Sequence, residues 1–182
     1  MALTATVRRF EIALADSDRG VYEQLDLRVA QHPSESDRYL IARVVARALE
    51  HAEGVEFSRG LAADDEPALW QRDLRGDLQA WIEIGAPAVE RLHRASKLGA
   101  RIAVYGWRQL ETLAADLAAR AVHRADQIEL FALDADFLDA VAAGLDRNNR
   151  WDLSVAGATV YLATATGQHE TAVTRIPVAP PA

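Results

Sequence analysis

The sequence contains no cysteine, and this absence removes several classes of chemistry. Disulfide bonds, zinc sites built from thiolates and thiol nucleophiles are all excluded. Lysine is nearly absent as well, because Lys97 is the only lysine among 20 basic residues. No apolar run approaches the ~18 residues of a membrane span, and residues 1–11 lack the apolar core of a signal peptide. We therefore expect a soluble, cytoplasmic protein that does not enter a membrane.

The common catalytic and cofactor motifs are missing too. The sequence has no glycine-rich phosphate loop, no His-Glu-x-x-His zinc pair, no G-x-S-x-G elbow and no dinucleotide fingerprint. The five histidines are scattered, and none forms a pair at metal-ligand spacing. We expect neither an organic cofactor nor a metal site built from histidine.

The overall composition is that of a globular protein. The chain has 182 residues, of which 50% are hydrophobic, so residues 1–182 are predicted to form a single domain with a real core. The formal net charge of −7 argues against broad, non-specific binding to nucleic acid, but leaves room for a local basic groove.

Hydrophobic periodicity predicts a mixed α/β (α+β) fold. Residues 5–14 and 22–30 read as an N-terminal hairpin, and a capping box at Ser34 opens a helix that runs to about Ala52. After that the pattern alternates between strands and helices, which implies parallel strands joined by right-handed crossovers. The predicted later elements are strands at 55–60, 77–85, 101–105 and 127–133, helices at 87–98, 108–124 and 136–145, and two or three strands within 151–176.

Glu83 is the most informative residue of the strand at 77–85. The two-residue period of a strand places Trp81 and Glu83 on one face, and Gly85 and Pro87 then end the strand and begin a helix. Glu83 therefore lies at the carboxyl end of a strand, where ligands usually bind in open α/β sheets. The alternative is a carboxylate that is simply solvated or paired with an arginine.

Two further groups of charges accompany Glu83. Three consecutive carboxylates, Asp64, Asp65 and Glu66, precede a proline and either cap a turn or join Glu83 around Mg²⁺ or Mn²⁺. On the helix at 87–98, the basic side chains near Lys97 are either a solvated face or a site that neutralises phosphate.

Several motifs together resemble the YaeQ family of small bacterial proteins. They are H-P-S-E at 32–35, F-S-R-G-L running into A-D-D-E-P over 57–67, W-I-E-I-G at 81–85 with Pro87, and the basic helix up to Lys97. The resemblance covers the length of the chain. It implies the fold of PD-(D/E)XK nucleases, which is a mixed sheet with one metal-binding carboxylate on a strand and a Glu-x-Lys element on the next.

This resemblance implies roles for named residues. Glu83 matches the Glu of Glu-x-Lys, and Asp64, Asp65 or Glu66 is the implied second metal ligand. The sequence departs from the pattern at Gly85, which stands where the element has its lysine.

Another residue must then act on the attacking water. Lys97 is expected to do this, because arginine does not act as a base near neutral pH. Arg94 is expected to stabilise charge, and Arg59 and Arg94 to hold phosphate.

The expected activity is Mg²⁺- or Mn²⁺-dependent phosphodiester hydrolysis of a nuclease type. The alternative is a fold without catalysis that binds or regulates a nucleic-acid or protein partner. The two hypotheses differ in one measurable property, because only the enzyme requires affinity for a divalent metal.

Overall fold

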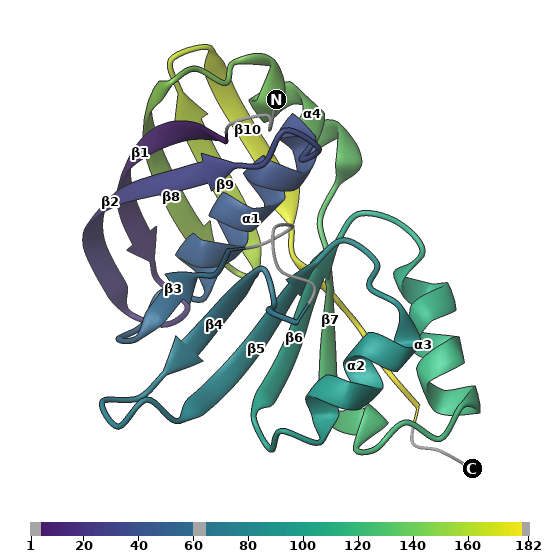
Figure 1. Cartoon of the computed structure of the whole chain (residues 1–182). Helices are drawn as coiled ribbons and strands as arrows, with labels where there is room; N and C mark the ends of the chain where they lie inside the picture. Colours follow the sequence, from purple (N-terminus) through teal and green to yellow (C-terminus); the bar gives the residue numbers. More distant parts are fainter. Residues whose placement is uncertain (1–4, 60–64, 180–182) are drawn as a thin grey trace. The chain divides into compact units, whose positions relative to one another are not determined.

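The computed structural model describes residues 5–59 and 65–179 of the chain. They group into two compact units, each built on its own sheet (Figure 1). The first unit lies within Met1–Val44 and Leu133–Val173, and the second within Val45–Ala132 and Thr174–Ala182. That residues 1–182 act as one domain stays a prediction.

The first unit contains a five-stranded sheet formed by two segments that are far apart in the sequence. The strands are β1 (Thr6–Asp16), β2 (Val21–Gln31), β8 (Asn148–Ala156), β9 (Thr159–Thr164) and β10 (Gly167–Ala172), in the order β10-β9-β8-β1-β2. β1 and β2 form the predicted antiparallel hairpin, whereas β1 and β8 are parallel.

One face of this sheet is buried and the other is open to solvent. β8 alternates strictly between exposed and buried side chains, as a strand with one covered face should. Phe10 and Trp151 meet edge to face on the covered side, with their ring centroids 4.9 Å apart. Helix α4 (Ala135–Ala143) contacts β10, and helix α1 (Asp37–Leu49) begins in this unit and continues into the second.

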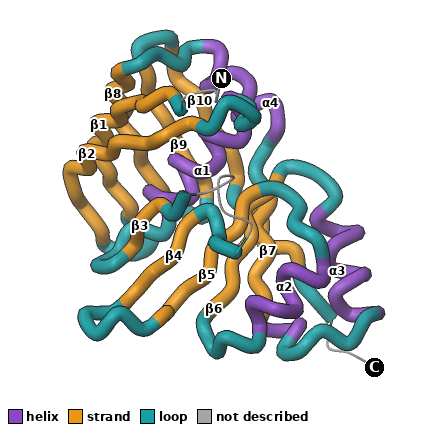
Figure 2. The backbone as a smooth tube through the Cα atoms, viewed as in Figure 1, coloured by secondary structure: helices purple, strands orange, loops and turns teal. Residues whose placement is uncertain are grey.

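The second unit contains a six-stranded mixed sheet. Its strands are β3 (Val55–Phe57), β4 (Leu69–Arg72), β5 (Leu78–Ile84), β6 (Arg101–Gly106), β7 (Ile128–Ala132) and β11 (Thr174–Ile176), in the order β11-β7-β6-β5-β4-β3. Strands β5, β6 and β7 are parallel and are joined by helices α2 (Val89–Ser96) and α3 (Leu110–Ala119), as the strand–helix alternation predicts (Figure 2). A short 3₁₀ helix, Ala125–Gln127, precedes β7.

The core of this unit lies where the two crossover helices meet the sheet. Leu92, Leu110 and Leu117 from the helices join Val104 and Leu130 from the strands in one buried cluster. Within α3, Leu110, Leu113 and Leu117 recur at the three- and four-residue spacing of a buried stripe.

Some elements differ from the sequence-based expectation. Strand β4 was predicted as part of a loop, because its four residues are too few to show an alternating pattern. Helix α3 ends at Ala119 rather than near residue 124, because Ala121 takes a left-handed backbone with φ of 46°. The tail forms four strands instead of two or three, and Gly167, predicted as a turn residue, opens β10.

The predicted mixed α/β (α+β) fold with helices flanking a mixed sheet is confirmed. The nuclease-like core stays a prediction. Among the described residues, no helix has both the length and the apolar character needed to cross a membrane.

Candidate functional site

Glu83 lies near the end of β5, the strand that links the antiparallel and parallel halves of the sheet. β5 pairs antiparallel with β4 and parallel with β6, with Glu83 opposite Val104. Both faces of the strand are buried from Ala80 onward, and Glu83 itself is 4% exposed. Gly85 then turns the chain with φ of +89°, a conformation that disfavours side chains larger than hydrogen. A short link leads from there into α2.

Two donors converge on one oxygen of Glu83. The Nε of Arg91 donates to Oε1 at 2.6 Å, and the indole Nε1 of Trp81 donates to the same atom at 2.7 Å. The guanidinium of Arg91 also lies 5.7 Å from the centre of the Trp81 ring, within range of a cation–π contact. In the described part of the chain, Oε2 accepts no hydrogen bond. Glu83 is thus held at one oxygen, and the other keeps its capacity to accept a bond.

Burial dominates the titration of this carboxyl group. Burial raises the pKa of Glu83 above its usual value, because the charged form loses its hydration. The hydrogen bond and charge of Arg91, and then the Trp81 indole, lower the pKa and oppose this shift. A buried carboxyl group with opposing influences at a strand end is a typical setting for function, although structural ion pairs show it too.

The acidic segment before β4 reaches the same helix. Both carboxylate oxygens of Glu66 bind Arg59: the backbone N–H of Arg59 donates to Oε2 at 3.0 Å and its Nε to Oε1 at 2.9 Å. These bonds hold the pKa of Glu66 below its usual value. The backbone carbonyl of Glu66 accepts a short hydrogen bond from Arg91. Arg91 therefore connects Glu83 to the acidic segment.

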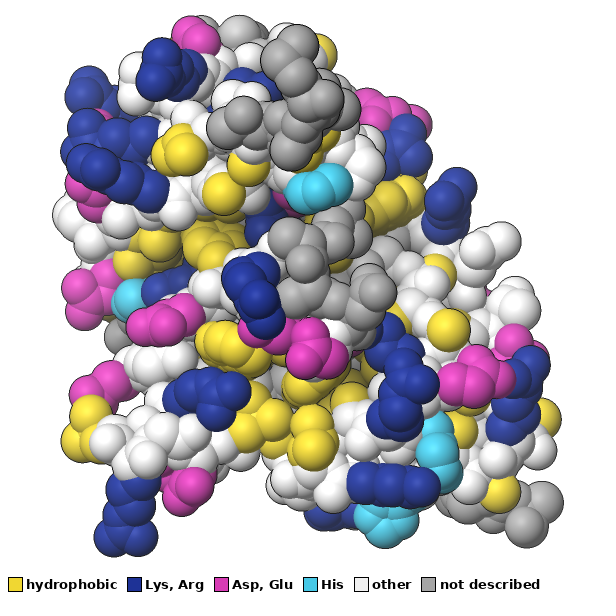
Figure 3. All heavy atoms as spheres, in the orientation of Figure 1, with side chains coloured by type: hydrophobic (Ala, Val, Ile, Leu, Met, Phe, Trp, Pro, Cys, Tyr) yellow, Lys and Arg dark blue, Asp and Glu magenta, His cyan; other side chains and the backbone are white. Residues whose placement is uncertain are grey.

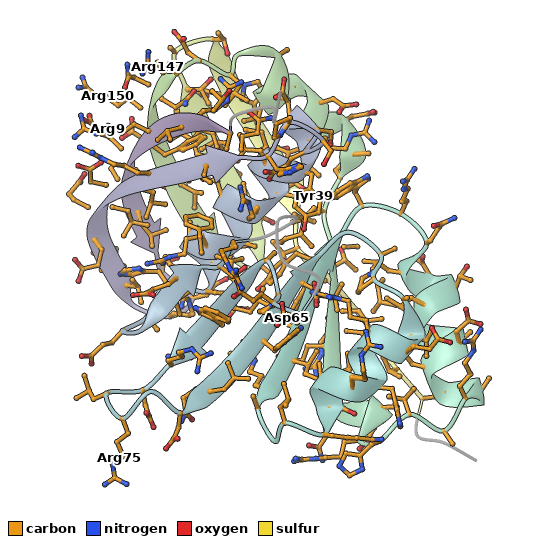
Figure 4. All side chains as sticks on the ribbon, viewed as in Figure 1. Arg9, Tyr39, Asp65, Arg75, Arg147 and Arg150 are labelled. Atoms are coloured by element: carbon orange, nitrogen blue, oxygen red, sulfur yellow. The ribbon has the colours of Figure 1, made fainter. Side chains whose placement is uncertain are left out.

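A cavity of about 390 Å³ lies beside these contacts. Its lining residues are Asp65, Trp81, Arg91, Arg94, Ala95 and Leu98. Apolar surface dominates the cavity, with one carboxylate and two guanidinium groups as its charged parts. Figure 4 labels Asp65 in this part of the second unit, and Figure 3 shows basic and histidine side chains gathered over the region of α2.

The structure brings together some of the predicted site residues and separates others. Asp65 and Arg94 line the cavity, and Glu83 is joined to it through Arg91. Lys97 is the exposed C-cap residue of α2 and does not line the cavity. Arg59 is engaged by Glu66.

Metal binding was also predicted for residues of this site. Asp64 is a predicted ligand that falls outside the described residues. Over residues 5–59 and 65–179, no group of three His, Cys, Asp or Glu side chains is placed to hold a metal ion.

Arg91 is the site residue that the sequence analysis missed. It lies eight residues after Glu83, and it lines the cavity together with Ala95, four residues further on in the same helix, and Leu98, just past the helix end. That spacing was visible in the sequence. The spacing does not by itself show which basic residue of the helix reaches Glu83.

Comparison with known proteins identifies close relatives. The family model described as YaeQ protein matches residues 1–173. The Escherichia coli (strain K12) protein described as "Uncharacterized protein YaeQ" is 30% identical over 164 residues, which cover 89% of this chain and 90% of the relative. A Salmonella typhi protein with the same description is 31% identical and covers 76% of this chain and 81% of its own length.

Two solved structures match as well. The crystal structure of YaeQ protein from Xanthomonas axonopodis pv. citri aligns with a TM-score of 0.87 and 36% identity, over 97% of this chain and all of that chain (100%). The structure of YaeQ protein from Pseudomonas syringae aligns with a TM-score of 0.87 and 32% identity, over 94% of this chain and 96% of that one. The chain belongs to the YaeQ protein family.

Proposed function

We propose that the second unit hydrolyses phosphodiester bonds with the help of Mg²⁺ or Mn²⁺. The observation that carries this proposal is the state of Glu83: a buried carboxylate at a strand end, held at Oε1 by two donors, with no hydrogen bond to Oε2 among the described residues. Asp65 and two arginines line the adjoining cavity.

The residues present suit a hard cation. Mg²⁺ and Mn²⁺ prefer carboxylate oxygen, and Mg²⁺ keeps several water ligands, so two carboxylates are enough to hold one ion. Glu83 and Asp65 would supply these oxygens. Glu66 is a weaker donor, because Arg59 engages both of its carboxylate oxygens. When bound, the ion would polarise a phosphoryl oxygen as a Lewis acid.

The protein's own side chains would orient the substrate. Arg91 fixes the rotamer of Glu83 through a bond of 2.6 Å. Arg94 is exposed at the cavity and would bind a phosphate oxygen, where its fixed charge offsets the charge that develops during the reaction. Lys97, at the C-terminal end of the same helix, is exposed and does not line the cavity, so we assign it no proton transfer here.

Calorimetric titration of Mn²⁺ tests this proposal. We expect binding to the wild type and to Glu90→Gln, which removes an exposed carboxylate from α2, and no binding to Glu83→Gln. A folded wild-type protein that does not bind Mn²⁺ would contradict the mechanism. Asp65→Asn should weaken Mn²⁺ binding, whereas Arg94→Ala should leave it unchanged and weaken only substrate binding.

A second candidate function is a non-catalytic binding or regulatory module. Two ion pairs favour it, because Arg91 neutralises Glu83 and Arg59 neutralises Glu66 without any metal. The cavity would then bind an anionic group of a nucleic-acid or protein partner through Arg94. This alternative expects no heat of Mn²⁺ binding.

A further inference from the structure

Strand β2 is an edge of the first unit's sheet. In the sheet that the described residues form, it pairs with β1 alone, along its whole length from Val21 to Gln31 (Figure 1). The amide of Arg9 donates to the carbonyl of Arg147 at 2.8 Å, on the side of β8. Arg9 and Arg28 therefore lie opposite each other without exchanging backbone hydrogen bonds. Arg28, and every second residue of β2 counted from it, directs its N–H and C=O away from β1.

This outer edge of β2 is accessible over most of its length. The residues that direct their backbone outward between the hairpin turn and Arg28 all have exposed side chains, and they are Tyr22, Gln24, Asp26 and Arg28. Further on, the outward carbonyl of Ala30 accepts a hydrogen bond from Arg43 at 2.9 Å. An exposed edge of this kind is a template for pairing with another strand.

The charges of β2 are poorly matched to those of β1. Asp26 lies directly opposite Glu11, and Arg28 lies directly opposite Arg9. Like charges at such positions are destabilising. Asp26 is compensated diagonally, because Arg9 donates two hydrogen bonds to it, at 2.9 and 2.8 Å. Of all the side chains that the structure describes, none forms an ion pair with Arg28.

A second copy of β2 has the complementary pattern. If two β2 strands run antiparallel about a two-fold axis at Leu27, Asp26 of each copy lies opposite Arg28 of the other. The outward backbone groups of the two strands also face each other in this register. On the covered face, Leu27 meets its own copy, and the buried Leu25 lies opposite the buried Val29. Moving the axis by one residue would place either two aspartates or two arginines opposite each other.

We propose that β2 pairs with β2 of a second copy of this chain, so that the two five-stranded sheets continue into each other around an axis at Leu27. The contact is self-complementary and closes at two copies. The open face carries carboxylates as well as arginines, and such a mixture fits a partner of the same pattern better than a partner of uniform charge. One strand from each copy makes a smaller contact than the standard interface of about 1,600 Å², so we expect a reversible dimer with a micromolar dissociation constant.

The proposal concerns the first unit and does not depend on phosphodiester hydrolysis in the second. Sedimentation velocity of the full chain at increasing concentration should show a monomer that converts to a dimer. Asp26→Arg and Arg28→Asp each create two like-charge contacts across the axis and should weaken the dimer by about 10-fold or more. Both variants should fold, because the new arginine lies opposite Glu11 and the new aspartate opposite Arg9. Circular dichroism verifies this.

A mixture of the two variants gives a sharper test. Asp26→Arg carries two positive charges at these positions and Arg28→Asp two negative charges, so an equimolar mixture should form heterodimers about as tight as the wild-type dimer. Glu170→Arg is the matched control, because it reverses an exposed charge on β10, at the opposite edge of the same sheet. It should dimerise as the wild type does.

The absence of cysteine allows the register itself to be tested. Leu27→Cys places one thiol of each copy at the axis, where a Cα separation of about 4.5 Å permits a disulfide. Glu23→Cys lies on the same strand but four positions from the axis, so its two thiols would be about 26 Å apart at ~3.3 Å per residue. Only Leu27→Cys should give a covalent dimer on mild oxidation.

Four results would overturn the proposal. The first is a wild-type chain that stays monomeric at about 300 μM, well above a micromolar dissociation constant. The second is an equal effect of Arg28→Asp and Glu170→Arg on dimerisation. The third is a mixture of the two folded charge variants that does not associate, and the fourth is a disulfide that forms as readily in Glu23→Cys as in Leu27→Cys.

Discussion

Arg91 and Glu83 form a largely buried ion pair, with the Nε of Arg91 2.6 Å from Oε1 of Glu83. The two side chains are 22% and 6% exposed. A buried pair is weak evidence for net stability, because desolvation consumes most of the attraction. Removing only one partner nonetheless lowers the stability strongly, because the other charge is then buried without its counter-ion. The pair also fixes the direction in which Glu83 points, which is the geometric condition for any ligand at Oε2.

Replacing Arg91 should destabilise the second unit strongly. Arg91→Ala leaves the Glu83 carboxylate buried without its cation, and we expect the free energy of unfolding to fall by about 3 kcal/mol. Arg94→Ala removes an exposed guanidinium from the same helix and should change it by less than about 0.5 kcal/mol. Urea denaturation followed by circular dichroism measures both. Equal effects of the two substitutions would contradict the assigned role of the pair.

The raised pKa of Glu83 predicts a particular dependence of stability on pH. The folded protein holds this proton to a higher pH than the unfolded chain does, so the contribution to stability is complete below the ordinary pKa of 4.5. It is lost as the pH rises from there through the raised folded pKa. Relative to Glu83→Gln, the wild type should therefore lose stability over this interval. Denaturation of both proteins between about pH 4 and pH 7 measures their free energies of unfolding. If the wild type became more stable relative to Glu83→Gln as the pH rose, the prediction would be contradicted.

Gly54 should tolerate no side chain. Its φ is +80°, and a Cβ would lie 1.9 Å from the backbone oxygen of Arg72, a residue whose amide donates to the carbonyl of Gly54 at 3.0 Å. Gly76 has a similar φ of +89° but open space around it. Gly76→Ala should cost about 1–2 kcal/mol for the left-handed backbone alone, and Gly54→Ala about 2 kcal/mol more for the clash. Thermal unfolding of the two variants measures both losses of stability. Equal losses would mean that the backbone around Gly54 shifts enough to accommodate the added Cβ.

Tyr105 anchors a polar network on the sheet of the second unit. Its hydroxyl donates to Oε1 of Glu50 at 2.6 Å, and Arg101 donates to Oε2 of Glu50 at 2.7 Å. Tyr105→Phe should reduce the free energy of unfolding by about 1–2 kcal/mol, since Glu50 keeps its arginine but loses a buried donor. Tyr161→Phe, at an exposed position, serves as the control and should be close to neutral. Chemical denaturation gives both values.

Much of the site's framework follows from sequence pattern. Period-two alternation placed Trp81 and Glu83 on one face, and their hydrogen bond of 2.7 Å confirms it. Gly85 correctly marked the end of the strand, whereas the helix begins at Val89, two residues after Pro87, and not at Pro87 as predicted. These features depend on residues that are close together in the sequence, so the sequence pattern alone predicts them.

The remainder depends on contacts that local pattern does not encode. Strand β4 has only the residues Leu69–Arg72 and owes its existence to pairing with β3 and β5. Which arginine of α2 reaches Glu83 depends on the angle at which the helix returns over the sheet. Arg91, Arg94 and Lys97 could not be ranked without that angle.

The parallel pairing of β1 with β8 has a consequence for the order of events during synthesis. Arg9 and Asn148 are partners in the same ladder, so the first unit's sheet cannot close until nearly the whole chain has left the ribosome. Strands β3 to β7 are complete well before that point, and β11 arrives last. Domains generally fold as units as they emerge, and pairings distant in sequence form slowly. The apolar face of the β1–β2 hairpin therefore stays without its β8 partner strand while the residues between β2 and β8 are synthesised.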